Sequence, residues 1–305
     1  MAKKSSFLLF SGSGNHELSL KIAKLLSVNL SKIEIVTFAD SEKRVRIEEN
    51  VRDKMIFVTA SLNNPVDTNL VELCLIGDAL KTNDAGRMVA VIPYYGYGRQ
   101  DKAHREGEGI SARVMAKLIE SVHFNKVVTV DLHSEIVAGF FDISVVHLYG
   151  AAIFVEPLQD LNEDLVVVSP DAGAAKRAQK FADLLDVPLV FIEKKRNLDK
   201  LHTIQNMRLV GEVAGKTAVL IDDVITSGST LVKGAYMLKE QGAKKVVACV
   251  THADFIEGTD NILKESPIDT VFVSDSIPVK SEQHFSRLKV VSLAPLLAEQ
   301  IKKMA

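Results

Sequence analysis

Short runs of β-branched and apolar residues alternate with amphipathic stretches along almost the whole chain. The apolar runs predict strands at 6–12, 55–60, 88–94, 126–132, 165–171, 188–194, 217–223, 245–252 and 270–275. The amphipathic stretches, whose apolar residues recur at three and four, predict helices at 16–27, 68–81, 111–121, 173–186 and 229–242. Apolar strands separated by helices are typical of parallel sheets that are covered on both faces. The expected fold class is therefore α/β, with mainly parallel sheets flanked by helices.

The length of the chain, 305 residues, suits two domains of ordinary size. No Gly/Ser linker marks a boundary, but the strand–helix pattern breaks near 148–163 and then restarts. We therefore expect an N-terminal domain over 1–150 and a C-terminal domain over 151–305. Both halves repeat the same plan of strand, polar turn and helix, which is consistent with duplication of one α/β unit.

Composition argues against several classes of partner. A net charge of -2 creates no positive field for nucleic acid or an anionic membrane surface. No stretch reaches membrane-spanning length, and the first apolar run is too short for a signal peptide. Cys74 and Cys249 lie in apolar runs, which favours buried free thiols in a reducing compartment, although two cysteines alone can also pair. We expect a cytoplasmic protein.

Polar residues gather where the predicted strands end. In open α/β sheets, ligands bind beyond the carboxyl ends of the strands, so these segments are the candidate site. They read GRQD at 98–101, DLHS at 131–134, SPDAG at 169–173, EKKR at 193–196 and DDVITSGST at 222–230.

The segment at 222–230 carries the clearest chemistry. Asp222 and Asp223 end an apolar strand, and a loop of small residues then leads into a predicted helix; the loop residues are Thr226, Ser227, Gly228, Ser229 and Thr230. Hydroxyls, close backbone approach and the free N–H groups of a helix start suit a phosphate group. The two carboxylates suit hydroxyl groups beside it, as in a sugar phosphate. The alternative is a capped strand–helix turn with Ser229 or Thr230 as the N-cap.

Five segments together resemble the ribose-phosphate diphosphokinases, also called PRPP synthetases, a family with the phosphoribosyltransferase fold. They are FADSEKRVRI at 38–47, GRQDKAHREGEGISAR at 98–113, VDLHSEIVAGFFDI at 130–143, VSPDAGAAKRA at 168–178 and the loop at 222–230. The resemblance covers nearly the whole chain in order and spacing. It implies two phosphoribosyltransferase-like domains, of which the second alone keeps a sugar-phosphate loop. The implied reaction transfers the diphosphoryl group of ATP to the 1-hydroxyl of ribose 5-phosphate, giving 5-phosphoribosyl 1-diphosphate and AMP.

The resemblance assigns ATP to two segments of the N-terminal half, with Phe38, Asp40, Ser41 and Glu42 in the first and Arg99, Gln100 and Asp101 in the second. The aromatic ring of Phe38 suits stacking on adenine, although a core phenylalanine is a close alternative. The planar guanidinium of Arg99 suits two phosphate oxygens, against the alternative of a solvated surface arginine.

Diphosphoryl transfer needs cations between phosphates, so we expect Mg²⁺. His133 and Asp171 are the metal positions that the resemblance implies, with Asp131 as a further candidate. Histidine is an unusual ligand for magnesium on chemical grounds, so its assignment rests on the resemblance. The alternative for Asp131 is a hydrogen bond that orients His133.

The basic segment 193–207 resembles the catalytic loop of the family, in which Lys194 and Arg196 hold charge that develops on the transferring group. A solvated basic loop is the alternative. Thr226 and Ser229 depart from the usual acidic residue and glycine of the sugar-phosphate loop, which leaves the regulatory class open. The resemblance also implies a homo-oligomer of dimers, up to a hexamer.

Two other functions compete with this interpretation. A phosphoribosyltransferase would consume PRPP, but the Arg-Gln-Asp segment and the second domain argue against it. A non-catalytic regulatory subunit would bind catalytic homologues, but such a subunit is expected to lose site residues, and Lys194, Arg196, Asp222 and Asp223 are all present.

Overall fold

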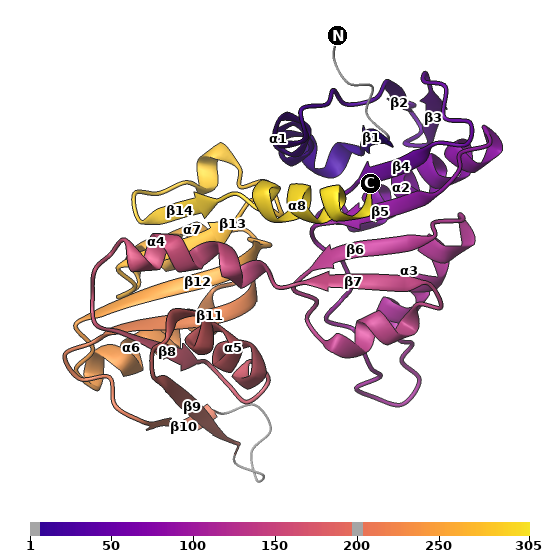
Figure 1. The fold of residues 1–305 in the computed structure, drawn as a ribbon. Helices are drawn as coiled ribbons and strands as arrows, with labels where there is room; N and C mark the ends of the chain where they lie inside the picture. Colours follow the sequence, from indigo (N-terminus) through magenta and orange to yellow (C-terminus); the bar gives the residue numbers. More distant parts are fainter. Residues whose placement is uncertain (1–6, 197–203) are drawn as a thin grey trace. The chain divides into compact units, whose positions relative to one another are not determined.

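The computed structural model describes residues 7–196 and 204–305, and within 194–196 and 204–207 it describes the backbone alone. The chain forms two compact units (Figure 1). Unit 1 comprises Met1–Gly150, Ser276–Pro278 and Ser292–Ala305, and unit 2 comprises Ala151–Asp275 and Val279–Val291. The sequence-based division at residue 150 did not anticipate that the segment Ser292–Ala305 groups with unit 1.

Unit 1 is built on a five-stranded, all-parallel sheet with the strand order β1-β4-β5-β6-β7. The strands are β1 (Phe7–Ser11), β4 (Met55–Thr59), β5 (Met88–Ile92), β6 (Lys126–Val130) and β7 (Ser144–Leu148). The helices are α1 (His16–Leu26), α2 (Val66–Thr82), α3 (Ser111–Ser121) and α8 (Ala294–Met304), with short 3-10 turns η1 (Ser13–Asn15) and η2 (Glu135–Phe140). A separate antiparallel hairpin, β2 (Ile33–Thr37) and β3 (Lys43–Ile47), packs against α2.

Unit 2 has a seven-stranded sheet with the order β10-β9-β8-β11-β12-β13-β14, parallel except for the edge strand β10. The strands are β8 (Leu165–Ser169), β9 (Leu189–Arg196), β10 (Ile204–Val210), β11 (Thr217–Ile225), β12 (Lys245–Ala253), β13 (Thr270–Ser274) and β14 (Leu288–Val291). The helices are α4 (Val155–Gln159), α5 (Ala175–Leu185), α6 (Ser229–Glu240) and α7 (Thr259–Glu265), with 3-10 turns η3 (Gly150–Phe154) and η4 (Ser281–Gln283).

The predicted α/β class, with mainly parallel sheets flanked by helices, is confirmed. All nine predicted strands and all five predicted helices are present, with ends that differ by a few residues. The core strands β5 and β8 are buried at every position, as strands covered on both faces must be. Each unit has its own apolar core between sheet and helices.

Unit 1 is completed by two segments that come late in the sequence. The carbonyl oxygen of Ser276 accepts hydrogen bonds from Asn15 Nδ2 at 3.1 Å and from Ser61 Oγ at 2.7 Å. Helix α8 packs beside α1 and buries Leu297 and Ile301. The unit therefore depends on contacts between segments more than 200 positions apart.

The two cysteines are free thiols, as the sequence predicts, with Cys249 buried and Cys74 partly buried. Within 7–196 and 204–305, no helix is both long and apolar enough to cross a membrane.

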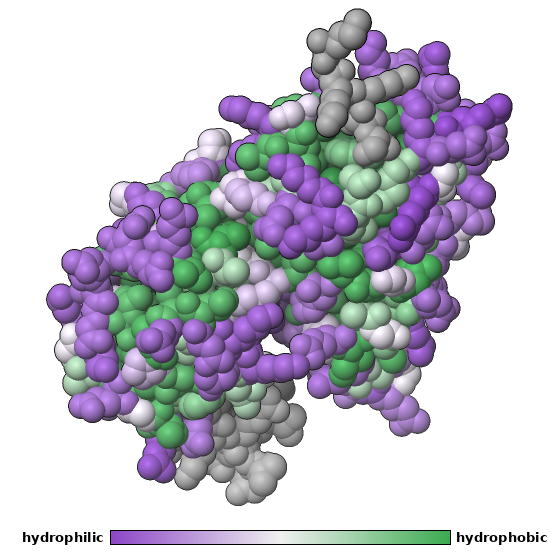
Figure 2. Space-filling view, viewed as in Figure 1, coloured by the Kyte–Doolittle hydropathy of each residue, from purple (hydrophilic) through white to green (hydrophobic). Residues whose placement is uncertain are grey.

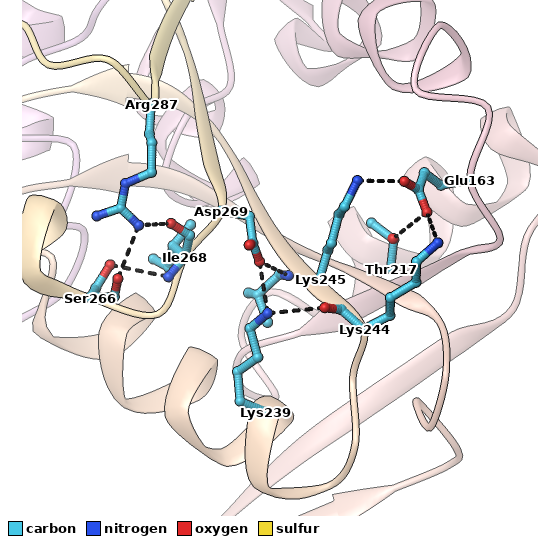
Figure 3. Close-up of polar contacts among 10 residues, drawn as sticks. Glu163, Thr217, Lys239, Lys244, Lys245, Ser266, Ile268, Asp269 and Arg287 are labelled. Carbon is cyan, nitrogen blue, oxygen red and sulfur yellow. Dashed lines mark hydrogen bonds and ion pairs between the residues drawn. The ribbon is translucent and has the colours of Figure 1, made fainter.

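Polar side chains tie together the amino ends of the unit 2 strands (Figure 3). Glu163 bonds Lys244 Nζ at 2.9 Å and Lys245 Nζ at 2.5 Å, and these lysines lower the pKa of Glu163 to about 2. Nearby, Arg287 donates hydrogen bonds to backbone oxygens that follow or end α7, those of Leu263, Lys264, Ser266 and Ile268. One guanidinium thus joins carbonyls of the last turn of α7 to carbonyls of the segment that follows it.

We expect Arg287→Met to destabilise unit 2, because four carbonyl oxygens lose a charged donor. The expected loss is about 1.5–3 kcal/mol of unfolding free energy, measured by thermal or denaturant melts. The control is Lys303→Met, which removes an exposed ion pair with Glu299 and is expected to cost less than about 1 kcal/mol. Equal small effects of the two variants would contradict the capping role of Arg287.

Candidate functional site

The acidic pair Asp222–Asp223 lies where β11 continues past its neighbour β8. Pairing with β8 ends at Leu220, whereas pairing with β12 continues to Ile225. The sequence placed the pair at the end of the strand, but the strand runs on for two further residues after Asp223. The pair therefore belongs to a rigid strand with one open edge, next to the segment that follows β8.

Arg177 from α5 holds this acidic pair. Its Nη1 atom lies 3.1 Å from Asp223 Oδ1 and 3.9 Å from Asp222 Oδ1. The Asp223 side chain is buried and that of Asp222 is 22% exposed. Burial, followed by the negative charge of Asp223, raises the pKa of Asp222 to about 7. The sequence alone did not single out Arg177, because a polar residue on an amphipathic helix is expected simply to face solvent.

The loop 226–230 leads directly into α6. Gly228 is the N-cap, with φ at 73°, and Ser229 is already the first helical residue. The predicted N-cap at Ser229 or Thr230 is therefore wrong, and Ser229 N donates to Ser227 Oγ at 3.4 Å. Phosphate binding by this turn stays a prediction. The side chains of Ser229 and Thr230 are exposed, and Ser227 Oγ lies 3.1 Å from Ser229 Oγ. Hydroxyls and first-turn N–H groups of a twelve-residue helix therefore meet beside the acidic pair, an arrangement that suits an anion.

Asp171 organises the neighbouring loop after β8. Its Oδ1 atom accepts hydrogen bonds from the N–H groups of Gly173 at 3.0 Å and Ala174 at 3.1 Å. Ser169 Oγ donates to the Asp171 carbonyl oxygen at 2.8 Å. The fold thus brings Asp171, Arg177, the acidic pair and the loop 226–230 to one edge of the unit 2 sheet.

The predicted nucleotide loop with Phe38, Asp40, Ser41 and Glu42 is the turn of the β2–β3 hairpin. Phe38 N donates to Glu42 O at 2.8 Å, and Ser41, with φ at 73°, donates to Phe38 O at 3.0 Å. Phe38 is 44% exposed, so the alternative of a core phenylalanine is wrong. The Arg44 guanidinium lies 5.7 Å from the centre of its ring. Hydrophilic residues surround this hairpin on the face shown in Figure 2.

The second predicted nucleotide segment follows β5 in the same unit. Arg99 and Gln100 are exposed, and Asp101 is partly exposed. Gln100 Oε1 accepts a hydrogen bond from Ser111 Oγ at 2.5 Å, which links the segment to the start of α3. The preceding tyrosines Tyr94 and Tyr95 are buried in the turn.

The candidate metal residues are divided between the units. Asp131 and His133 follow β6 in unit 1, and Asp171 follows β8 in unit 2. Asp131 is buried with φ at 36°, and Leu132 N donates to His147 Nε2 at 2.9 Å. Among residues 7–196 and 204–305, no three His, Cys, Asp or Glu residues cluster in a way that could hold one metal ion. The carboxylate oxygens of Asp131 and Asp171 fit the ligand preference of Mg²⁺, and the full ligand set stays a prediction.

The basic segment at 193–207 is partly a hairpin rather than a loop. β9 continues to Arg196, and Lys194 pairs in register with Met207 of the antiparallel strand β10. The sequence predicts the apolar first half of β9, but the polar residues that follow it hid the end of β9 and the pairing with β10. The side chains of Lys194 and Arg196 and all of 197–203 lie outside the described residues, so the catalytic role of these two residues stays a prediction.

Two units with mainly parallel sheets, one of which has an acidic pair beside the start of a helix, define a protein of the phosphoribosyltransferase-like class. Residues 7–122 match the model of the N-terminal domain of ribose phosphate pyrophosphokinase, and residues 201–305 match that of the phosphoribosyl synthetase-associated domain. This chain belongs to the ribose-phosphate pyrophosphokinase family.

Full-length relatives support this membership. The chain is 41% identical over 302 residues to the ribose-phosphate pyrophosphokinase of Caldanaerobacter subterraneus subsp. tengcongensis, covering 98% of this chain and 95% of the relative. It is 40% identical over 298 residues to that of Aquifex aeolicus, covering 97% and 95%. The crystal structure of phosphoribosylpyrophosphate synthetase from Mycobacterium smegmatis superposes with a TM-score of 0.91 at 38% identity, covering 98% of this chain and 99% of that one.

We expect Asp222→Asn to stabilise the ligand-free protein at pH 8. The raised pKa means that the folded state holds a proton that the unfolded chain releases between about pH 4 and 7, so stability falls as pH rises through that window. Asparagine removes the whole of this cost above pH 7 and only the smaller part that is already present at pH 5. The melting temperature at pH 8 should rise by several degrees, on the order of 1–3 kcal/mol, with a smaller gain at pH 5.

The matched control is Asp164→Asn, because the Asp164 side chain in the same unit is 72% exposed and is expected to change little. A loss of stability in Asp222→Asn at pH 8, or the same gain at both pH values, would contradict the buried-charge explanation.

Proposed function

We propose that this chain transfers the diphosphoryl group of ATP to the 1-hydroxyl of ribose 5-phosphate, giving 5-phosphoribosyl 1-diphosphate and AMP. The main support is the acidic pair of β11 beside the start of α6, in a chain that matches its family over nearly its full length. The vicinal hydroxyls of ribose donate to Asp222 and Asp223. The 5-phosphate accepts from the hydroxyls and N–H groups of residues 226–230.

ATP binds to segments of unit 1. Phe38 presents an exposed ring for adenine, and its turn offers the polar groups of Asp40, Ser41 and Glu42. Arg99, whose guanidinium suits two phosphate oxygens, is exposed together with Gln100 and Asp101 at the end of β5.

In the reaction, the oxygen of the ribose 1-hydroxyl attacks the β-phosphorus of ATP. A new O–P bond forms as the bond from the β-phosphorus to the α-phosphate oxygen breaks, and AMP leaves with that oxygen. The candidate Mg²⁺ ligands are His133 and Asp131 in unit 1 and Asp171 in unit 2, and a bound Mg²⁺ would supply positive charge between the phosphates. Lys194 and Arg196 stabilise the charge that develops on the transferring group.

We also propose a cellular location and an oligomeric state for this enzyme. The family membership and the absence of a membrane-crossing helix from the described residues are consistent with a cytoplasmic enzyme. The resemblance of the sequence motifs to the family implies a homo-oligomer built from dimers, up to a hexamer.

The deciding experiment is AMP formation from purified protein, ATP, ribose 5-phosphate and Mg²⁺, followed by chromatography. EDTA should abolish it. Asp222→Asn should weaken the binding of ribose 5-phosphate by about 1.5–3 kcal/mol, because one charged hydrogen bond to the sugar is lost. The affinity for ATP should stay nearly unchanged. A wild-type protein that binds both substrates without releasing AMP would point instead to the non-catalytic subunit. AMP release without ribose 5-phosphate would contradict the proposed acceptor.

Lys194 is the residue on which the proposed chemistry depends most. We expect Lys194→Ala to lower kcat by about 10²–10³, with modest changes in both KM values, because its charge is needed mainly in the transition state. Lys195→Ala is the control: Lys195 is the next residue of β9, and neighbouring positions of a strand belong to opposite faces. Steady-state kinetics that give both variants wild-type turnover would favour the solvated basic segment.

A further inference from the structure

The β2–β3 hairpin cannot hold its turn in place alone. Each strand has five residues, and a lone two-stranded hairpin is only marginally stable in water. Apolar side chains of the hairpin, including Ile35 and Val45, pack against the unit 1 core. Apolar contacts are non-directional, so they dock the hairpin without fixing the position of its exposed turn at 38–42.

A buried ion pair supplies a directional contact at the end of this turn. Lys43 is the first residue of β3 and follows Glu42 directly. Its Nζ atom bonds Glu72 Oε2 on α2, with side-chain exposures of 9% for Lys43 and 2% for Glu72. A charge in such surroundings is strongly unfavourable unless it is paired, so the pair admits few alternative geometries.

Glu72 is itself held by a second segment. Ser13 N donates to Glu72 Oε1 at 2.5 Å, and Ser13 Oγ donates to Glu72 Oε2 at 2.8 Å. Ser13 follows β1, so the carboxylate connects the end of a core strand to the hairpin. Ser13 alone donates to both carboxylate oxygens of Glu72, so this carboxylate keeps its orientation even without Lys43.

We propose that the Lys43–Glu72 pair is a positioning device for the turn 38–42, through which it sets ATP affinity without contacting ATP. This inference rests on the proposed function for the role of the turn, but the positioning itself is a property of the ligand-free protein. Buried ion pairs add little net stability compared with apolar residues, so a role in placement accounts for this pair better than a role in folding.

The test uses Lys43→Met in the full-length protein, because methionine keeps the apolar stem and removes the charge. We expect KM for ATP to rise about tenfold, because a displaced turn 38–42 loses about one charge-assisted contact with ATP. KM for ribose 5-phosphate and kcat at saturating ATP should stay within about twofold. The control is Arg52→Met, which removes an exposed ion pair with Asp84 in the same unit and should change none of these values.

A second measurement is independent of catalysis. Amide hydrogen exchange without substrates should become faster at Phe38 and Ser41, whose N–H groups bond within the turn, and stay unchanged in β5. Lys43→Met should also lower the melting temperature, because it leaves the buried Glu72 without a counter-charge. The double variant Lys43→Met, Glu72→Met should restore the melting temperature without restoring KM for ATP.

The outcomes separate the two proposals. Unchanged exchange at the turn in Lys43→Met would overturn the positioning role, as would equal rises in both KM values. A wild-type protein that forms no AMP would defeat the proposed function, while the exchange measurement would still decide the positioning role.

Discussion

Two adjacent carboxylates inside one strand are the constraint around which unit 2 is arranged. Asp222 and Asp223 repel each other and lose hydration, and these effects raise the pKa of Asp222 to about 7. A strand that ended at Leu220, where β8 ends its pairing, would leave them on a loop in water. Pairing with β12 instead keeps them fixed, and Arg177 supplies the compensating charge. A site that binds hydroxyl groups needs such acceptors in place before the ligand arrives.

The exposed loops of the two units are held in position in different ways. In unit 2, the loop 226–230 is short and continues directly from β11 into α6, so covalent geometry positions it. In unit 1, the turn 38–42 stands on a hairpin outside the main sheet, and packing and the Lys43–Glu72 pair must position it. The loop 226–230 is thus held by the strand and the helix at its two ends, whereas the turn 38–42 depends on side-chain contacts with residues distant in sequence.

Sequence predicted the parts of this fold that have a strong local signal. Strands such as β5, which is apolar at every position, and β8, which has four apolar residues in a row, stand out from helices with period 3.6. Among the strands that were missed, β3 reads KRVRI and has too many charges for an apolar run, and β14 has only four residues. The candidate site residues at strand ends were predicted because parallel topology brings such ends together, and their roles stay predictions. Arg177 and Glu72 were missed because each lies on a helix, and only the three-dimensional structure shows which carboxylate or lysine it meets.

The late position of α8 has a consequence for synthesis on the ribosome. Helix α8 packs beside α1 and buries Leu297 and Ile301, yet the whole of unit 2 lies between them in the sequence. The amino-terminal unit therefore leaves the ribosome first and is finished last, since the surface of α1 that α8 covers stays open until translation has passed residue 301. During that interval the partly built unit exposes apolar surface in the way that makes nascent chains substrates for chaperones.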